Sequence, residues 1–303
     1  MDIGIFDSAA SAGGTFDDLI ASATRAHDDG FASWWVPQIF GFEALSLLAV
    51  VGREVPDLWL GTAVVPTYPR HPVTMAQLAL TAQAASGGRL TLGIGLSHQM
   101  VIENMFGMSF DHPARHMADH LAVLMPLLRG ESVAHTGESV SASMTLTVPP
   151  GIPTPDVVVA ALGPRMLDLA GRVADGTVTW MTGPKTLEQH IVPSITAAAT
   201  DAGRKPPRVV AALPVLVTDD EATARARCGK VFEVYGFLPS YRAMLDREGV
   251  EGPADVAIIG SETEVREQIL AMEGVGVTEF VAVEFTRPGP EADATRALLR
   301  SLL

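Results

Sequence analysis

The chain has 303 residues, 48% of them apolar, and a formal net charge of −14 at pH 7. This acidic balance argues against a nucleic-acid partner, which needs basic patches, and the single cysteine excludes an internal disulfide framework and a cysteine-based metal cluster. No apolar run is long enough to span a bilayer and the start of the chain lacks a basic signal region, so we expect a cytoplasmic protein without a membrane partner.

Short apolar runs recur along the whole chain, and such runs are typical of buried parallel strands. The eight predicted strands are Asp2–Phe6, Ala32–Val36, Leu58–Val65, Arg89–Gly95, Asp156–Leu162, Gly176–Met181, Val209–Val217 and Glu279–Phe285. Helical patterns fall between them, and this alternation predicts an α/β protein with a (β/α)8 TIM barrel. No long linker or composition break divides the chain, so we predict that residues 1–303 form a single domain.

Capping residues mark several of the predicted helices. Thr15 can cap the first helix, and Gly30 can end it. Pro72 suits the first position of the helix that follows the third strand. Ser261 and Glu264 have the spacing of a capping box, which predicts a helix start near the end of the chain.

Two stretches interrupt the alternation of strands and helices. Residues 131–154 predict an extra hairpin followed by a proline-rich connection. Residues 231–256 contain several aromatic residues and a Gly-Pro turn, and they predict a long insertion. Insertions on a barrel often form lids or specificity loops.

The stretch SGGRLTLGIGLSHQ contains a glycine, a serine and a histidine that are compatible with three kinds of site. A nucleophile elbow requires G-x-S-x-G, and Gln99 stands where the last glycine belongs. A dinucleotide loop requires G-x-G-x-x-G, and His98 replaces its third glycine. The third interpretation fits best: a barrel strand ends here, and Gly93 and Gly95 let a flat ligand approach the backbone. Ser97 and His98 then lie at the barrel mouth, where such enzymes place their chemistry.

Two segments resemble those of a known family. LGTAVVPTYPRHPVTMAQLALTAQAASGGRLTLGIG (residues 60–95) closely resembles the hallmark segment of the bacterial luciferase-like superfamily, and AALGPRMLDLAGRVADGTVTWMTGP (residues 160–184) is similar to its cofactor-phosphate region. The resemblance implies a (β/α)8 barrel, usually a homodimer, that binds FMN or the deazaflavin coenzyme F420. The stretches WWVPQIFGFEAL and MFGMSFDHPARHMADHLAVL make the chain most similar to the actinobacterial, F420-dependent branch.

The resemblance also implies which residues contact the cofactor. The Ala63–Val64 peptide aligns with a non-proline cis bond behind the ring of deazaflavin enzymes. The helix start at Gly163 and the Arg165 side chain can hold a phosphate. The alternative for Ala63–Val64 is an ordinary buried strand, and the alternative for Gly163 and Arg165 is a plain helix start with a solvated arginine. For Trp180 and Met181, which end the sixth predicted strand, the alternative is packing in the core. The full set is Thr62, Ala63, Val64, Gly95, Leu96, Ser97, Leu162, Gly163, Pro164, Arg165, Met166, Trp180 and Met181.

His98 and Gln38 are the candidate catalytic residues. An imidazole titrates near neutrality, so His98 can donate a proton; its alternative role is packing against the next helix. By resemblance, His98 occupies a place where some F420-dependent dehydrogenases carry an acidic residue. Several of those enzymes also carry adjacent Asp and His after the second strand, where this chain has Gln38. An amide cannot titrate, so the sequence favours reduction of an activated double bond or imine over alcohol oxidation.

The other candidate residues have weaker signals. The remaining histidines lack metal-ligand spacing, so we predict no metal. Several aromatic residues are candidates for an apolar wall or a lid around the substrate, with core packing as the alternative. They are Trp34, Trp35, Phe40, Phe42, Phe106, Phe110, Tyr235, Phe237 and Tyr241.

The leading hypothesis is an F420-dependent oxidoreductase that transfers a hydride between C5 of the deazaflavin and a small organic substrate. The same fold could hold FMN and act as a monooxygenase. A barrel that binds a cofactor without turnover is a further alternative, because the Asp-His pair is missing. A lyase or hydrolase that uses Ser97 and His98 ranks last, since no triad acid is identifiable.

Overall fold

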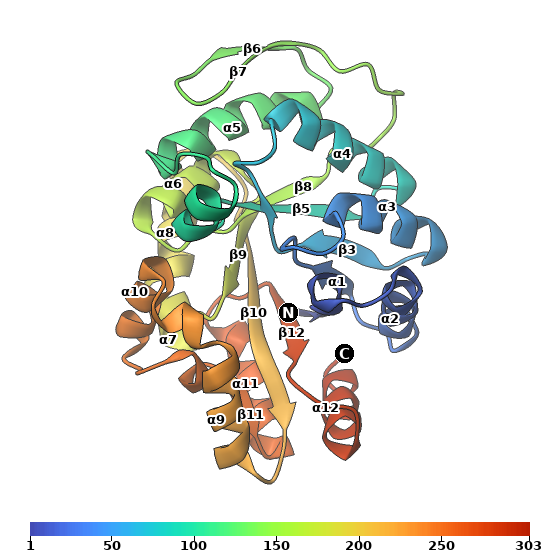
Figure 1. Ribbon diagram of the computed structural model, residues 1–303, viewed down its shortest axis with the longest axis vertical. Coiled ribbons are helices and arrows are strands. Elements are labelled where there is room, and N and C mark those ends of the chain that lie inside the picture. The colour runs from blue at the N-terminus through green and yellow to red at the C-terminus, as the bar shows by residue number, and fades with distance from the viewer.

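Eight parallel strands close into a barrel in the computed structural model, which describes residues 1–303 except for the side chain of Ser11 (Figure 1). Around the barrel the order is β1 (Asp2–Phe6), β2 (Ser33–Val36), β3 (Trp59–Thr62), β5 (Leu90–Gly95), β8 (Asp156–Val159), β9 (Gly176–Trp180), β10 (Arg208–Val217) and β12 (Glu279–Glu284). Parallel pairing of β12 with β1 closes the ring, with Ile3 opposite Phe280. The predicted (β/α)8 barrel is therefore confirmed.

Two strands differ from the prediction. The predicted third strand is divided: β3 ends at Thr62, the Ala63–Val64 peptide is cis, and β4 (Val65–Pro66) pairs with β5. A further strand, β11 (Ile258–Gly260), pairs with the carboxyl-terminal end of β10. The sequence did not predict β11, because three apolar residues are too few to show a period.

Helices cover the outside of the barrel (Figure 1). They are α1 (Ala9–Ala12), α2 (Phe16–Asp28), α3 (Ala44–Glu54), α4 (Pro72–Ala85), α5 (Pro113–Leu128), α6 (Pro164–Val173), α7 (Pro184–Thr186), α8 (Val192–Asp201), α9 (Glu221–Val231), α10 (Pro239–Glu248), α11 (Glu262–Gly274) and α12 (Pro290–Arg300). Short π or 3₁₀ turns are η1 (Val101–Met105), η2 (Leu187–Ile191), η3 (Glu233–Gly236) and η4 (Pro253–Asp255). The predicted caps at Thr15 and Ser261 form capping boxes, and Pro72 is the first residue of α4.

The interior of the barrel has an apolar layer above a polar one. The apolar layer includes Trp35, Val158, Val178, Val210, Ala212 and Val281. Beneath it, Glu279 is only 4% exposed and accepts hydrogen bonds from Trp35 Nε1 at 2.8 Å and Arg208 Nη2 at 2.7 Å. A buried carboxylate needs such partners, because burying an unpaired charge is costly. The amino-terminal end of the barrel is thus filled, and access is left to the carboxyl-terminal end.

The first insertion forms the predicted hairpin. Strands β6 (Val133–Thr136) and β7 (Ser141–Met144) pair antiparallel, and Figure 1 shows them as a separate ribbon beyond α5. The second insertion contains η3, α10 and η4. Helix α10 lies beside α7, away from the hairpin (Figure 1). No helix in the described part of the chain has the length and apolar character needed to cross a membrane.

Candidate active site

A cavity of about 1680 Å³ opens at the carboxyl ends of the barrel strands. Strand ends and the loops after them form its inner wall, and the second insertion forms another part of the wall. Barrel enzymes place their chemistry at this end of the fold. The inner wall includes Phe6, Ala63, Val64, Gly95, Ala160, Leu162, Val178, Trp180, Ala212 and Val283.

The floor of the cavity is shaped by the cis peptide and by a glycine. Ala63 and Val64 both line the cavity, and the peptide that joins them is cis, as the resemblance implied. Gly95 lies beside them: a Cβ atom at this position would stand 2.5 Å from Val64 Cγ2 and 3.2 Å from Ala160 Cβ. The floor is therefore a cradle that a side chain at Gly95 would fill, and it suits a flat ring.

Gly93 and Thr62 have a different role from the one predicted. A Cβ atom at Gly93 would lie 1.8 Å from the Thr62 carbonyl oxygen, so this glycine lets two strands approach, not a ligand. The Thr62 hydroxyl donates to the Gly93 carbonyl at 2.8 Å and accepts from the Gly93 N–H at 2.9 Å. Thr62 is fully buried and does not line the cavity, so the prediction that it contacts the cofactor was wrong.

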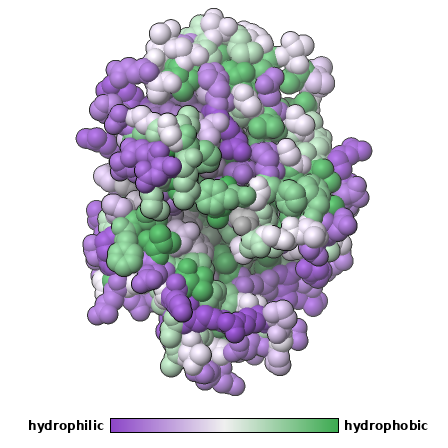
Figure 2. All heavy atoms as spheres, viewed as in Figure 1, coloured by the Kyte–Doolittle hydropathy of each residue, from purple (hydrophilic) through white to green (hydrophobic). Residues whose placement is uncertain are grey.

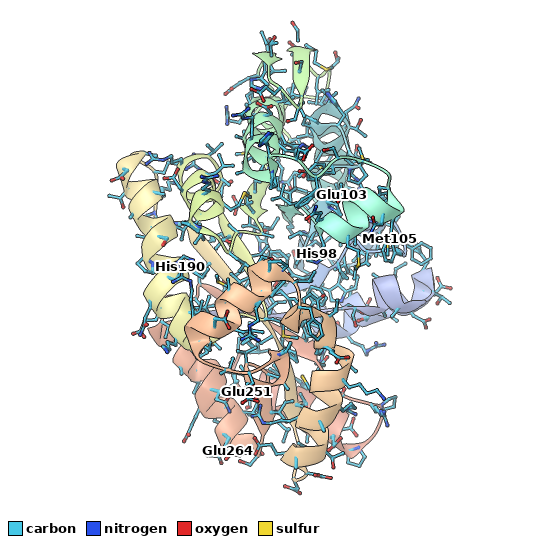
Figure 3. All side chains as sticks on the ribbon, turned by 60° about the vertical axis from the view of Figure 1, so that its left-hand side comes forward. His98, Glu103, Met105, His190, Glu251 and Glu264 are labelled. Carbon is cyan, nitrogen blue, oxygen red and sulfur yellow. The ribbon has the colours of Figure 1, made fainter. Side chains whose placement is uncertain are left out.

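His98 lies on the cavity wall just beyond β5. Ser97 adopts a left-handed conformation (φ 61°), and the His98 carbonyl accepts hydrogen bonds from Val101 and Ile102 at the start of η1. Figure 3 shows His98 between the turn that carries Glu103 and Met105 and the orange segment of the second insertion. Burial lowers the pKa of the imidazole below its ordinary 6.5. The ring is half-buried and lines the cavity.

Gln38 lines the cavity and also anchors a loop. Its side-chain Oε1 accepts a hydrogen bond from the Ala44 N–H at 2.6 Å, at the first residue of α3. The amide oxygen is thereby oriented, which leaves the Nε2 group as the donor for a ligand. The structure thus gives Gln38 a positioning role that its place in the sequence did not show.

The start of α6 borders the cavity on another side. Leu162, Gly163 and Met166 line the cavity, and Gly163 is the N-cap of this ten-residue helix. Pro164 and Arg165 are exposed and lie outside the lining. The unpaired N–H groups of a helix start attract anions, so this place suits a phosphate that extends beyond the cavity, with the arginine within the same turn.

Trp180, the last residue of β9, and Met181, which follows it, point in different directions. Trp180 lines the cavity, stacks with Phe6 (centroids 6.3 Å apart) and packs edge-on against Tyr235 of the second insertion. Met181 is fully buried in the core and does not line the cavity. The prediction that Met181 contacts the cofactor was wrong, because Met181 follows β9 in a left-handed conformation (φ 51°) that turns its side chain into the core.

Some cavity residues were missed by the sequence analysis. Arg70 and Glu284 line the cavity, and each is ion-paired: Arg70 with Glu43 at 3.5 Å, Glu284 with Arg296 at 2.8 Å. Burial raises the pKa of Glu284 above its ordinary value. Glu284 lies near the end of the last predicted strand, and because strand ends define the mouth of a barrel, this position could have identified it as a cavity residue. Arg70 had no comparable signal.

The two histidines of α5, His116 and His120, pack within the fold. His116 stacks on Tyr68, with ring centroids 3.9 Å apart, and its Nε2 lies 3.0 Å from the Thr67 hydroxyl. His120 is fully buried, and neither ring nitrogen has a hydrogen-bond partner among the described residues. Burial lowers the pKa of His120 to about 3. These residues do not line the cavity and are structural.

An open barrel mouth with a flat floor, an adjacent helix start and a desolvated histidine defines the class of this protein: a (β/α)8-barrel enzyme. The chain belongs to the luciferase-like monooxygenase family, whose sequence profile matches residues 1–279. A 5,10-methylenetetrahydromethanopterin reductase from Methanolobus tindarius is 29% identical over 283 residues, which is 93% of this chain and 85% of the reductase.

Solved structures share the whole fold. The coenzyme F420-dependent tetrahydromethanopterin reductase from Methanopyrus kandleri superimposes with a TM-score of 0.82 at 22% identity, covering 99% of this chain and 97% of the reductase. The oxygenating component of 3,6-diketocamphane monooxygenase from Pseudomonas putida, in complex with FMN, gives 0.78 at 18% identity and covers 99% and 98% of the two chains. At these identities the likeness concerns the fold alone.

Proposed function

We propose that this protein is an F420-dependent oxidoreductase that works as an F420H2-dependent reductase on a small organic substrate with an activated C=C or C=N bond. The observation that carries the proposal is that one cavity joins the glycine-backed floor, the helix start at Gly163 and the half-buried His98. The similarity to a methylenetetrahydromethanopterin reductase over 93% of the chain supports the same class of reaction.

The residues present suit a deazaflavin. The cradle at Gly95 and the Ala63–Val64 peptide would hold the ring, and the α6 start with Arg165 would hold the phosphate. When bound, reduced F420 supplies a hydride from its C5 atom. Leu96, Ser97 and Leu162 also line the cavity, next in the chain to Gly95 and Gly163, and would contact the sugar-like chain that joins ring and phosphate.

The side chains above the floor would serve the substrate. When protonated, the His98 imidazole would donate a proton to the atom of the substrate double bond that does not receive the hydride. Gln38 Nε2 can donate a hydrogen bond to the substrate, while its Oε1 remains held by Ala44. Packing of Tyr241 beside His98 keeps water from the imidazole, so the proton is delivered within the cavity.

The first test compares the two cofactors. Fluorescence-quench titrations with F420 and with FMN would be followed by an oxygen-free assay of reduced F420 against enones and imines. Micromolar F420 binding, weak FMN binding and oxidation of reduced F420 by an acceptor are expected. Tight FMN binding with oxygen consumption would instead make the protein a monooxygenase. F420 binding without turnover on any acceptor would make it a non-catalytic binding barrel.

Three further expectations belong to this proposal. A homodimer is expected from the family, and sedimentation of the purified protein tests it. A single folding unit over residues 1–303 predicts one cooperative calorimetric transition. A cytoplasmic location is tested by fractionating cells that express the protein.

A further inference from the structure

We infer that the outer part of the cavity binds an uncharged, extended apolar substrate, such as an alkyl chain or fused ring system attached to the reacting group. This inference deepens the proposed function and rests on it for the reaction. The size of the cavity, its charged residues and its rim favour such a substrate independently of the reaction.

The cavity is larger than one ligand requires. Sites for small molecules and cofactors usually enclose roughly 300–1,000 Å³, whereas this one encloses about 1680 Å³. After the ring and its phosphate-bearing chain are seated against Gly95 and Gly163, a space of ordinary ligand size is left towards the mouth. A substrate no larger than an enone ring would leave much of it filled with water.

The charged residues of the lining are already paired. Arg70 is the only lysine or arginine among the described lining residues; it faces Glu43 at 3.5 Å and its side chain is only 17% exposed. Glu284 accepts a hydrogen bond from Arg296 at 2.8 Å. An anionic substrate group would therefore have to share the Arg70 guanidinium with the Glu43 carboxylate, and no other described lysine or arginine lines the cavity to neutralise it.

The other lining carboxylate is also engaged. Both oxygens of Glu103 accept hydrogen bonds from Gln99 Nε2, at 3.0 and 3.1 Å, on the turn beside His98. A substrate ammonium would compete with that amide at a solvated position, where ion pairs contribute little. The lining thus favours a neutral substrate over both charged kinds.

Exposed apolar side chains form a rim around the mouth. Five large apolar residues that line the cavity are also exposed, with 45–64% of their surface accessible. We call these residues the rim cluster: Ile39, Phe40, Met100, Phe106 and Val231. They come from three separate segments, namely the loop after β2, the turn after β5 and the end of α9. Figure 2 shows apolar side chains gathered across the middle of this face.

The rim cluster fits a substrate better than a second copy of the chain. Contiguous exposed apolar surface usually marks a binding site. Here the same side chains line the cavity, so a flat protein surface laid over them would cover the cavity that His98 also lines. A chain that leaves the reacting group and runs outward would instead cover them one after another.

The experiment uses 2-cyclohexenones that carry n-alkyl chains from methyl to decyl. Dissociation constants are measured by intrinsic fluorescence, since Trp180 lies in the cavity wall, first without cofactor and then with F420. Each added methylene contributes about 0.8 kcal/mol, so the Kd should fall about fourfold per methylene until the chain passes the rim. Analogues that end in a carboxylate or an ammonium should bind at least tenfold more weakly than the neutral chain of equal length.

Rim variants supply the second readout. Phe40→Ser and Phe106→Ser should raise the Kd of the decyl compound about tenfold and leave that of the methyl compound unchanged. Leu270→Ser is the matched control, because Leu270 is 51% exposed on α11 and does not line the cavity. All three positions are exposed, so the thermal midpoint should stay near that of the unmodified protein.

Several outcomes would overturn the inference. These are a Kd that does not depend on chain length, equal binding of a charged analogue, and rim variants that dissociate a dimer without changing the Kd. The last outcome would assign the rim to an interface between copies. Failure of the proposed function is separate: alkyl binding without cofactor, together with no F420 binding, would disprove the reaction and leave the apolar site standing.

Discussion

The imidazole of His98 lies 5.9 Å from the phenol ring of Tyr241, centroid to centroid, with 58° between the ring planes. His98 follows the fourth strand of the barrel, whereas Tyr241 belongs to α10 of the second insertion. The insertion therefore covers the candidate proton donor, and this burial lowers the pKa of His98 below 6.5. A lowered pKa means that only a small fraction of the imidazole is protonated at pH 7.

The reductive reaction should therefore accelerate as the pH falls. If the protonated imidazole donates the proton, the rate should rise through an apparent pKa below 6.5 and level off beneath it. His98→Gln should lower the rate of F420H2 oxidation by about 10²- to 10⁴-fold, which is the usual contribution of a general acid. The measurement is stopped-flow recovery of F420 absorbance between pH 4.5 and 8.

Tyr241→Ala separates proton donation from a merely structural role of His98. Removing the phenol admits water, so the apparent pKa of the rate profile should move up towards 6.5. A rate that does not depend on pH in this range, or a His98→Gln variant with full activity, would show that the proton comes from elsewhere.

Arg165→Ala should weaken F420 binding about tenfold to a hundredfold. A hydrogen bond between charged groups contributes about 1.5–3 kcal/mol, and the helix start that remains still attracts the phosphate. Arg172→Ala is the control, because Arg172 is exposed on the same helix and pairs with Asp168. Equal losses in the two variants, measured by fluorescence titration, would mean that only net charge matters.

The barrel could be predicted from the sequence because its strands are buried on both sides. A run such as Val209–Val217 is continuous and rich in β-branched residues, and β10 matches it to within one residue. The strand β11 could not be predicted, since its three residues are in a strand only through pairing with the far end of β10. The eight barrel strands could therefore be predicted, but not the additional strand that pairs beside them.

The site could be predicted less completely. The strand ends identified Gly95, His98 and Trp180, which all line the cavity. The sequence did not show which way each side chain points. Met181, for example, adopts a left-handed conformation (φ 51°) and turns into the core. Gln38 is held by the Ala44 N–H across a loop, and no pattern in the sequence predicts such a contact.

Gly95→Ala should damage the floor of the cavity. The added Cβ would stand 2.5 Å from Val64 Cγ2, so the floor must shift where the ring would lie. We expect F420 affinity to fall at least tenfold and the free energy of unfolding to fall by about 1–3 kcal/mol, as for other overpacked sites. Gly252→Ala is the control, because a Cβ atom there meets nothing within 4 Å. Unchanged affinity in Gly95→Ala, measured by titration, would place the ring elsewhere.

His120 should make the fold sensitive to acid. Its pKa is about 3 in the folded chain, against an ordinary 6.5, so between these values the unfolded chain holds a proton that the folded chain does not. The free energy of unfolding therefore falls as the pH falls from 6.5 towards 3, because protons favour the unfolded chain. His120→Leu should remove that part of the slope in urea unfolding between pH 6 and 4. His27→Gln, on the surface of α2, should leave it unchanged. An identical slope in all three proteins would show that protonation of His120 is accommodated without unfolding.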